Sequence, residues 1–289
     1  MIDVQGLTYS YNHDKNYAIS DISFSVERGE VFALLGPSGA GKSTTQGILT
    51  GLLQIQHGSG QVAGFDLKHL SRDLFNKIGV SFEQSNVYGK LTALENLEFY
   101  RKLFDGDTEE PLELLKLVGL DHVSGKRAAT FSKGMKHRLT FARSMINKPE
   151  LWFLDEPTTG LDPAIASQIK DIVMSRKKHG TTILLTTHNM FLADQLSDKV
   201  GFIVDGELKL VDTPRNLKLR YGQKLVQVEY FEDDQLKTET LSLVNEEEKM
   251  RLGAIVNAGR IETMHTREAT LEEIFIKVTG RELVYNEAD

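Results

Sequence analysis

The sequence predicts an α/β fold built around a parallel sheet, followed by a small α+β domain. Three apolar runs, residues 31–35, 151–154 and 183–185, are uninterrupted and end at turn residues, a pattern typical of strands covered on both faces. The charge is uneven: residues 1–221 contain 26 Lys/Arg and 26 Asp/Glu, and residues 222–289 contain 8 and 15. We therefore predict a main domain over residues 1–221 and an acidic accessory domain over residues 222–289.

Composition narrows the classes of protein that this chain can belong to. With 289 residues, 40% of them hydrophobic, the chain can bury a large core. No apolar run approaches the roughly 18–20 residues that span a bilayer, and the first residues lack a signal peptide pattern, so we expect a soluble, cytosolic chain. The absence of cysteine excludes disulfides, thiolate metal sites and cysteine nucleophiles. The acidic C-terminal segment argues against nucleic acid as a partner.

Antiparallel strands are expected as additions to the central sheet, which becomes a mixed sheet, and in an antiparallel β subdomain. Ile22, Phe24 and Val26 alternate with polar residues, and residues 200–204 and 207–211 flank Asp205-Gly206, a strong hairpin signal. Between these strands, residues 90 to 145 have the pattern of a helical insertion. Apolar residues from Met135 onward repeat at helical spacing, which places residues 132–134 at a helix N-terminus, where backbone amides can face an anion.

The accessory domain is predicted to be compact. Strands are expected over residues 225–230 and about 238–243, and a helix over residues 246–256. A closing helix begins at Thr270, because Thr270 and Glu273 have the spacing of a capping box.

A phosphate-binding loop follows the first apolar run. Residues 36–43 read G-x-x-x-x-G-K-S, in which glycines let backbone N–H groups surround the β- and γ-phosphates of a nucleotide. Lys42 can bridge those phosphates, Ser43 can bind Mg²⁺ and Thr44 can support the α/β region. The predicted loop residues are Gly36, Pro37, Ser38, Gly39, Ala40 and Gly41.

Two further segments follow in a fixed order. Residues 131–136 read Phe-Ser-Lys-Gly-Met-Lys, and residues 151–157 form an apolar strand that ends in the carboxylates Asp155 and Glu156. Each segment alone is ambiguous, but these two together with the phosphate loop at residues 36–43 indicate an ATP-driven protein with the fold of a P-loop NTPase.

On these residues the chain resembles the nucleotide-binding subunits of ATP-binding cassette (ABC) transporters, over about residues 2 to 215. Residues 160–163 resemble the D-loop, with Asp162, and residues 186–189 resemble the switch-histidine loop, with His188. Tyr11 stands where the family places an aromatic residue against adenine, although packing is the other explanation and Tyr9 is the second candidate. The family signature LSGGQ is replaced by residues 131–135, which keep Ser132 and Gly134. Glu83 aligns with the Q-loop glutamine and Gln84 follows it, so either can be the Q-loop residue.

The resemblance implies a catalytic scheme. Asp155 would hold Mg²⁺, commonly through water, together with Ser43 and with Glu83 or Gln84. Glu156 would orient or deprotonate the attacking water, and His188 would contact the γ-phosphate and Glu156. Lys42 would complete the catalytic set. ATP and Mg²⁺ are the expected cofactors.

The resemblance also implies partners. The phosphate loop of one protomer would face the signature of the other, so that Ser132 and Gly134 complete the partner's site in a dimer with a second copy or with a paralogous ATPase. Lys133 is expected to be compatible with turnover. A separate integral membrane permease would hold the chain at the inner face of the cell membrane and export a substrate. Residues 87–91 would line the groove for the permease or belong to the core of the helical insertion. The alternative function is a cassette ATPase acting on ribosomes or nucleic acid.

Overall fold

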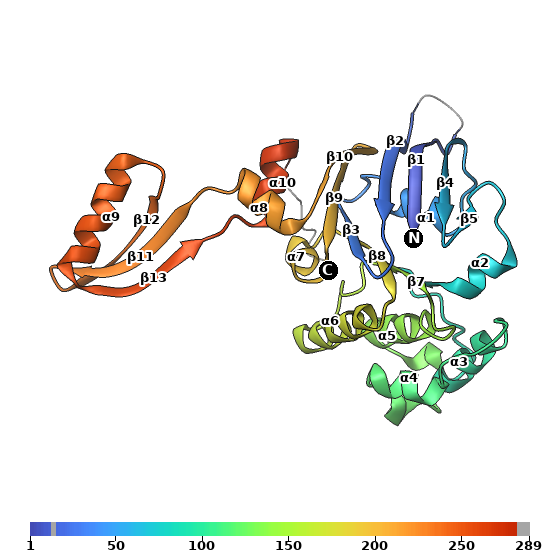
Figure 1. Cartoon of the computed structure of the whole chain (residues 1–289). Coiled ribbons are helices and arrows are strands. Elements are labelled where there is room, and N and C mark those ends of the chain that lie inside the picture. Colours follow the sequence, from blue (N-terminus) through green and yellow to red (C-terminus); the bar gives the residue numbers. More distant parts are fainter. Residues whose placement is uncertain (13–15, 282–289) are drawn as a thin grey trace. The chain divides into compact units, whose positions relative to one another are not determined.

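The computed structural model describes residues 1–12 and 16–281, which divide into two compact units (Figure 1). The first unit spans Met1–Thr213, and the second begins at Pro214, ahead of the acidic segment. Residues 282–289 of the predicted accessory domain lie outside the described residues. Across the described ranges, the helices are all too short or too polar to cross a bilayer.

The centre of the first unit is a six-stranded sheet in the order β10-β9-β3-β8-β7-β6. Its strands are β3 (Val31–Leu35), β6 (Ile78–Ser81), β7 (Leu151–Asp155), β8 (Thr182–Thr187), β9 (Lys199–Val204) and β10 (Glu207–Asp212). Every residue of β3, β7 and β8 is buried, which explains why their sequences are uninterrupted apolar runs. Because neighbouring strands from β9 to β6 are parallel, their carboxyl ends meet at one edge of the sheet.

The antiparallel strands agree with the predicted mixed sheet and antiparallel β subdomain, and two assignments of single strands differ. The hairpin at Asp205-Gly206 forms as expected, but only β10 is antiparallel, because β9 pairs in parallel with β3. The alternating segment around Phe24 belongs to a separate sheet in the order β2-β1-β4-β5. This second sheet contains β1 (Ile2–Tyr9), β2 (Ile19–Val26), β4 (His57–Val62) and β5 (Phe65–Asp66). Apolar side chains of both sheets form one core, so the second sheet is packed onto the first.

Helices fill the rest of the first unit. Helix α1 (Lys42–Leu49) follows β3, α6 (Pro163–Lys178) follows β7, and α7 (Met190–Leu196) follows β8. Between β4 and β7 lie α2 (Arg72–Lys77), α3 (Ala93–Arg101), α4 (Pro111–Leu117) and α5 (Lys133–Arg143), with short 3₁₀ turns at Asp121–Val123 and Ala128–Thr130. Ser132 caps α5 by accepting a hydrogen bond from Met135 N at 3.2 Å, so the predicted helix start is confirmed.

The second unit contains α8 (Pro214–Tyr221), β11 (Leu225–Glu232), β12 (Gln235–Ser242), α9 (Glu246–Ala258), β13 (Ile261–Arg267) and α10 (Leu271–Thr279). Its antiparallel sheet has the order β12-β11-β13 and buries a small core that includes Val228 and Leu241. The capping box of Thr270 and Glu273 is present at the start of α10. Strand β13 was not predicted, because its side chains are mostly exposed and show no apolar alternation.

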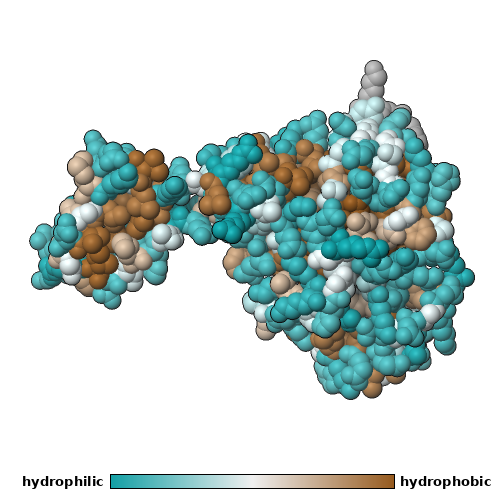
Figure 2. Space-filling view, viewed as in Figure 1, coloured by the Kyte–Doolittle hydropathy of each residue, from teal (hydrophilic) through white to brown (hydrophobic). Residues whose placement is uncertain are grey.

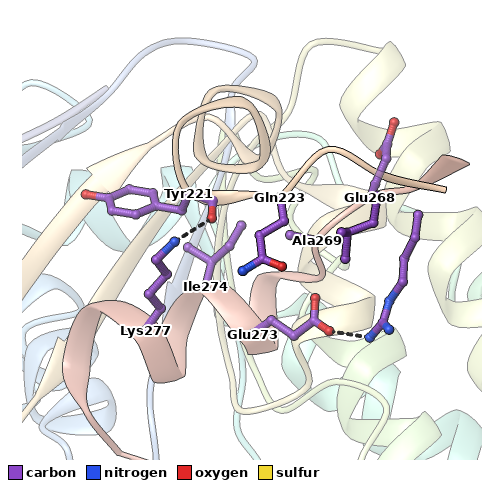
Figure 3. A pocket seen from close by; sticks show the side chains of 9 residues that line it. Tyr221, Gln223, Glu268, Ala269, Glu273, Ile274 and Lys277 are labelled. Carbon is purple, nitrogen blue, oxygen red and sulfur yellow. Dashed lines mark hydrogen bonds and ion pairs between the residues drawn. The ribbon is translucent and has the colours of Figure 1, made fainter. Parts of the chain in front are cut away.

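Apolar side chains and a small cavity mark the surface of the second unit. Figure 2 shows apolar side chains gathered on one face of this unit. Val256 and Met264 are among the exposed apolar residues of the unit. Figure 3 shows a cavity of about 300 Å³ near the start of α10. Lys277 Nζ donates to the carbonyl of Tyr221 at 3.0 Å, and Arg267 pairs with Glu273 at 2.7 Å. These charged groups are therefore already paired within the unit.

Candidate functional site

The phosphate loop connects β3 to α1, and its glycines are required by close packing and by backbone conformation. A Cβ on Gly36 would lie 2.1 Å from the carbonyl oxygen of Ile203, and one on Gly41 would lie 2.7 Å from Ile19 Cγ2. Gly39 has a φ of 78°, in the left-handed region, and a Cβ there would point into open space. The loop therefore lies directly on the neighbouring strands while its middle stays open for a ligand.

Lys42 lies inside this loop. Its Nζ atom donates hydrogen bonds to the carbonyls of Gly36 at 2.7 Å and Pro37 at 2.9 Å, and the residue is buried. Burial lowers the pKa of Lys42, while the carboxylates of Glu156 and Asp155 act in the opposite direction. The ammonium group is thus a short distance from the acidic end of β7.

Asp155 ends β7, two strands from the phosphate loop. The hydroxyl of Thr186, on β8, donates to Asp155 Oδ1. Burial raises the pKa of the Asp155 carboxyl, and the nearby carboxylates of Glu156 and Glu83 raise it further. A group of carboxylates that oppose each other's ionisation is a favourable environment for a cation.

The carboxylate of Glu156 accepts four hydrogen bonds. Its Oε1 atom accepts from His188 N at 2.9 Å and from His188 Nδ1 at 2.6 Å. Its Oε2 atom accepts from Thr187 Oγ1 at 2.8 Å and from Thr159 Oγ1 at 3.1 Å. Only 6% of the residue is exposed. Four donors on a buried carboxylate fix its position and favour its ionised form.

The hydrogen bond between His188 Nδ1 and Glu156 Oε1 shifts the pKa values of both residues. Burial alone would raise the pKa of Glu156, but hydrogen bonds from His188 and Thr187 and the charge of Lys42 bring it below its ordinary value. The same hydrogen bond, which His188 donates to Glu156, raises the pKa of His188, although burial opposes it. The pair therefore combines an ionised carboxylate with an imidazole that is more easily protonated than usual.

Both Q-loop candidates lie in the loop after β6. Glu83 and Gln84 are exposed and follow the end of β6 by two and three residues. The charge of Glu83 raises the pKa values of Lys42, Asp155 and His188, which places its carboxylate near all three.

The remaining predicted residues lie around the phosphate loop or on neighbouring loops. Tyr11 is 60% exposed, its hydroxyl lies 3.1 Å from Thr44 Oγ1, and its ring meets Tyr9 edge to face at 5.1 Å. Ser43 is exposed at the first turn of α1. Asp162 caps α6 by accepting from the backbone N–H of Ile165 at 3.0 Å.

Ser132 and Gly134 lie beside the D-loop. A Cβ on Gly134 would be 3.5 Å from Leu161 Cδ2, and one on Gly160 would be 4.0 Å from Lys133 Cε. Among the interactions of residues 1–12 and 16–281, none joins Ser132 or Gly134 to the phosphate loop.

The sequence interpretation did not identify the hydroxyls that hold the carboxylates. Thr186 and Thr187 end β8 and reach Asp155 and Glu156, and Thr159 reaches Glu156 from the turn after β7. The available signal was the position of two threonines at the carboxyl end of a strand parallel to β7.

Comparisons with known proteins identify the family of the chain. The family model described as ABC transporter matches residues 19–159. The chain is 46% identical to a fluoroquinolones export ATP-binding protein of Mycobacterium tuberculosis over 98% of this chain and 94% of that one. It is 35% identical to a lantibiotic transport ATP-binding protein of Streptococcus pyogenes, over 78% of this chain and 98% of the relative.

A solved structure has the same fold. A dimeric ATP-binding cassette in a post-hydrolysis state, bound to ADP and Pi, superposes with a TM-score of 0.67 at 27% identity, covering 74% of this chain and 98% of that one. The predicted α/β cassette fold is therefore confirmed. By its motifs, its fold and these relatives, the chain belongs to the family of ABC transporter ATP-binding subunits.

Proposed function

We propose that the chain hydrolyses ATP to ADP and phosphate and uses the reaction to drive export through a separate membrane permease. The observation that carries this proposal is the Glu156 carboxylate, which is held ionised by His188 and Thr187 beside a buried phosphate-loop lysine. A protein that only bound nucleotide would not require a carboxylate oriented so fully at this position.

The proposed reaction relies on positioning and charge compensation. Lys42 binds the β- and γ-phosphates after exchanging its contacts with the loop carbonyls, and Glu156 orients the attacking water and accepts its proton. The Nδ1 atom of His188 is used by Glu156, so contact with the γ-phosphate falls to Nε2. Tyr11, exposed beside Thr44, is in a position to stack on adenine.

Mg²⁺ fits the residues present. Asp155 lies among carboxylates that raise its pKa, and Ser43 presents a hydroxyl at the first turn of α1. Magnesium is usually bound by one or two carboxylates together with the phosphates of its nucleotide. When bound it would neutralise charge on the β- and γ-phosphate oxygens. We assign Ser43 and Asp155 as ligands, with Glu83 or Gln84 as the third contact; the charge of Glu83 acts on Asp155, whereas the neutral side chain of Gln84 has no charge to reveal its distance.

We further propose that two copies, or one copy and a paralogous ATPase, assemble head to tail around ATP. The solved relative that carries ADP and Pi is dimeric. Ser132, Gly134 and Asp162 lie on adjacent loops whose backbone amides can complete the site of a partner. Binding between two nucleotide-loaded copies would bring the signature of one to the phosphate loop of the other.

The permease is proposed to dock on an apolar cavity of about 210 Å³ in the first unit. Leu52, Phe75, Phe82 and Tyr100 contribute to its lining, and Leu52 and Phe75 are exposed. Residues 87–91 do not line this cavity, although Arg143 connects its wall to the carbonyl of Asn86 at 2.9 Å. Docking here would place the chain at the inner face of the cell membrane.

Two measurements test the proposal. Phosphate release from ATP is compared for the wild-type chain and for Glu156→Gln, which keeps the size of the side chain and removes the base. We expect turnover by the wild type and a loss of at least about 100-fold in the variant. In the same variant, ATP with Mg²⁺ should produce dimers in size-exclusion chromatography. A wild-type chain that binds ATP but never releases phosphate, alone or with its permease, would refute the enzymatic assignment.

A further inference from the structure

His137 is a buried histidine beside the backbone of Glu156, and the proposed reaction gives it no role. His137 is on α5, one turn after Gly134, and only 4% of it is exposed. Neither ring nitrogen forms a complete hydrogen bond with any of the described residues. Buried polar atoms are nearly always paired, so an imidazole left in this state requires an explanation.

The group that faces the ring is the backbone of Glu156. Burial lowers the pKa of His137, and the backbone of Glu156 acts in the opposite direction. An interaction that raises the pKa of a histidine favours the donating form of the ring, so the backbone group involved is an acceptor. This acceptor is the carbonyl of Glu156, since the Glu156 N–H already donates to Thr186 O at 2.9 Å.

The Glu156 carbonyl has room for this contact. It accepts one hydrogen bond, from Thr159 N at 3.2 Å, and a carbonyl oxygen has two lone pairs. The second lone pair is therefore open to a hydrogen bond from His137, which neither ring nitrogen completes in this structure.

The backbone of Glu156 needs such support. Its φ is 46°, in the left-handed region, which is costly for a residue with a Cβ and persists only when the surroundings hold it. The direction of the carboxylate depends on this conformation. The Glu156 backbone already forms hydrogen bonds with Thr186 and Thr159. A further hydrogen bond from α5 to the Glu156 carbonyl would hold both this backbone conformation and the direction of the carboxylate.

We propose that His137 is a positioning residue for Glu156, whose ring N–H binds the Glu156 carbonyl and couples α5 to the catalytic carboxylate. Helix α5 begins at Ser132, in the segment proposed to meet a partner's nucleotide. Closure of the dimer would then complete the hydrogen bond and set Glu156 for hydrolysis. This inference rests on the proposed ATPase function.

The test compares His137→Gln with His137→Met. Glutamine and methionine have similar size and helix propensity, but only glutamine offers an N–H to the carbonyl. We expect kcat for ATP to fall about tenfold in His137→Met with KM unchanged, and to stay within about twofold of the wild type in His137→Gln. The matched control is Thr140→Val, because the Thr140 hydroxyl is buried on the same helix and has no hydrogen-bond partner. We expect this control to keep the wild-type kcat.

The outcomes separate this inference from the proposed function. If the wild type hydrolyses ATP and His137→Met matches it, or if the Gln and Met variants lose equal activity, the role of His137 is refuted while the ATPase stands. Absence of wild-type hydrolysis refutes the proposed function instead. If His137→Met does not fold, ¹⁵N NMR of histidine in the full chain with ATP and Mg²⁺, where the dimer is closed, replaces it, with His137→Gln identifying the signal. A neutral ring with one hydrogen-bonded N–H supports the proposal, and a solvent-exchanging ring that titrates as an ordinary histidine overturns it.

Discussion

Replacing Thr187 by valine tests how Glu156 is held. Thr187 is 1% exposed, and its hydroxyl donates to Glu156 Oε2 at 2.8 Å and accepts from Asn189 N at 3.0 Å. Valine has nearly the same shape, so the change removes these two hydrogen bonds without leaving a cavity. A hydrogen bond to a charged group contributes about 1.5–3 kcal/mol, and a neutral one about 0.5–1.5 kcal/mol. We expect the free energy of unfolding to fall by about 2–4 kcal/mol.

The loss should depend on pH. The pKa of Glu156 lies below its ordinary value in the folded protein, so ionisation of Glu156 stabilises the fold above the unfolded-state pKa. That contribution disappears as the pH falls through the folded-state pKa. Thr187→Val raises the folded-state pKa, and the difference in stability between wild type and variant should therefore be largest near neutral pH and shrink in acid. The acid limb of the ATPase pH profile should move to higher pH.

Urea unfolding at several pH values measures the loss of unfolding free energy, and initial rates of phosphate release measure the shift of the acid limb of the ATPase pH profile. Thr140→Val is the matched control, because it removes a buried hydroxyl that has no partner, and its stability should be equal to or above wild type at every pH. A loss in Thr187→Val that is the same at all pH values, with an unmoved acid limb, would show that Thr187 does not act on the ionised carboxylate.

Three further substitutions probe the rest of the site. Lys133→Gly should leave ATP turnover within a few-fold of wild type, because the exposed Lys133 adds charge without blocking the helix amides; a many-fold rise in phosphate release would contradict this. Glu83→Gln should raise the Mg²⁺ concentration needed for half-maximal turnover while Gln84→Ala does not, and the reverse result would assign the Q-loop to Gln84. Gly36→Ala should destabilise the chain by about 1–3 kcal/mol or more in urea unfolding, since its Cβ would meet the carbonyl of Ile203, and an unchanged midpoint would refute the packing argument.

The sequence determined the chemistry and most of the fold because these depend on local patterns. A buried parallel strand is mostly apolar, so β3, β7 and β8 were visible as the apolar runs at residues 31–35, 151–154 and 183–185. The phosphate loop needs glycines and a lysine at fixed spacing, which makes Gly36 to Ser43 readable without a structure. The position of residues 132–134 at the start of α5 followed from the apolar helical repeat that begins at Met135.

The contact between His188 and Glu156 was expected from the family resemblance, but the other groups that hold Glu156 were decided by the tertiary structure alone. The hydrogen bond from Thr187 and the placement of His137 join segments that are far apart in the chain, and the left-handed backbone at Glu156 is seen only in the folded protein. Strand β13 could not be predicted from the sequence either, because an exposed edge strand buries few side chains and shows no apolar alternation. Local periodicity records what each segment buries, whereas the orientation and ionisation of a carboxylate depend on donors that folding brings to it from other strands and helices.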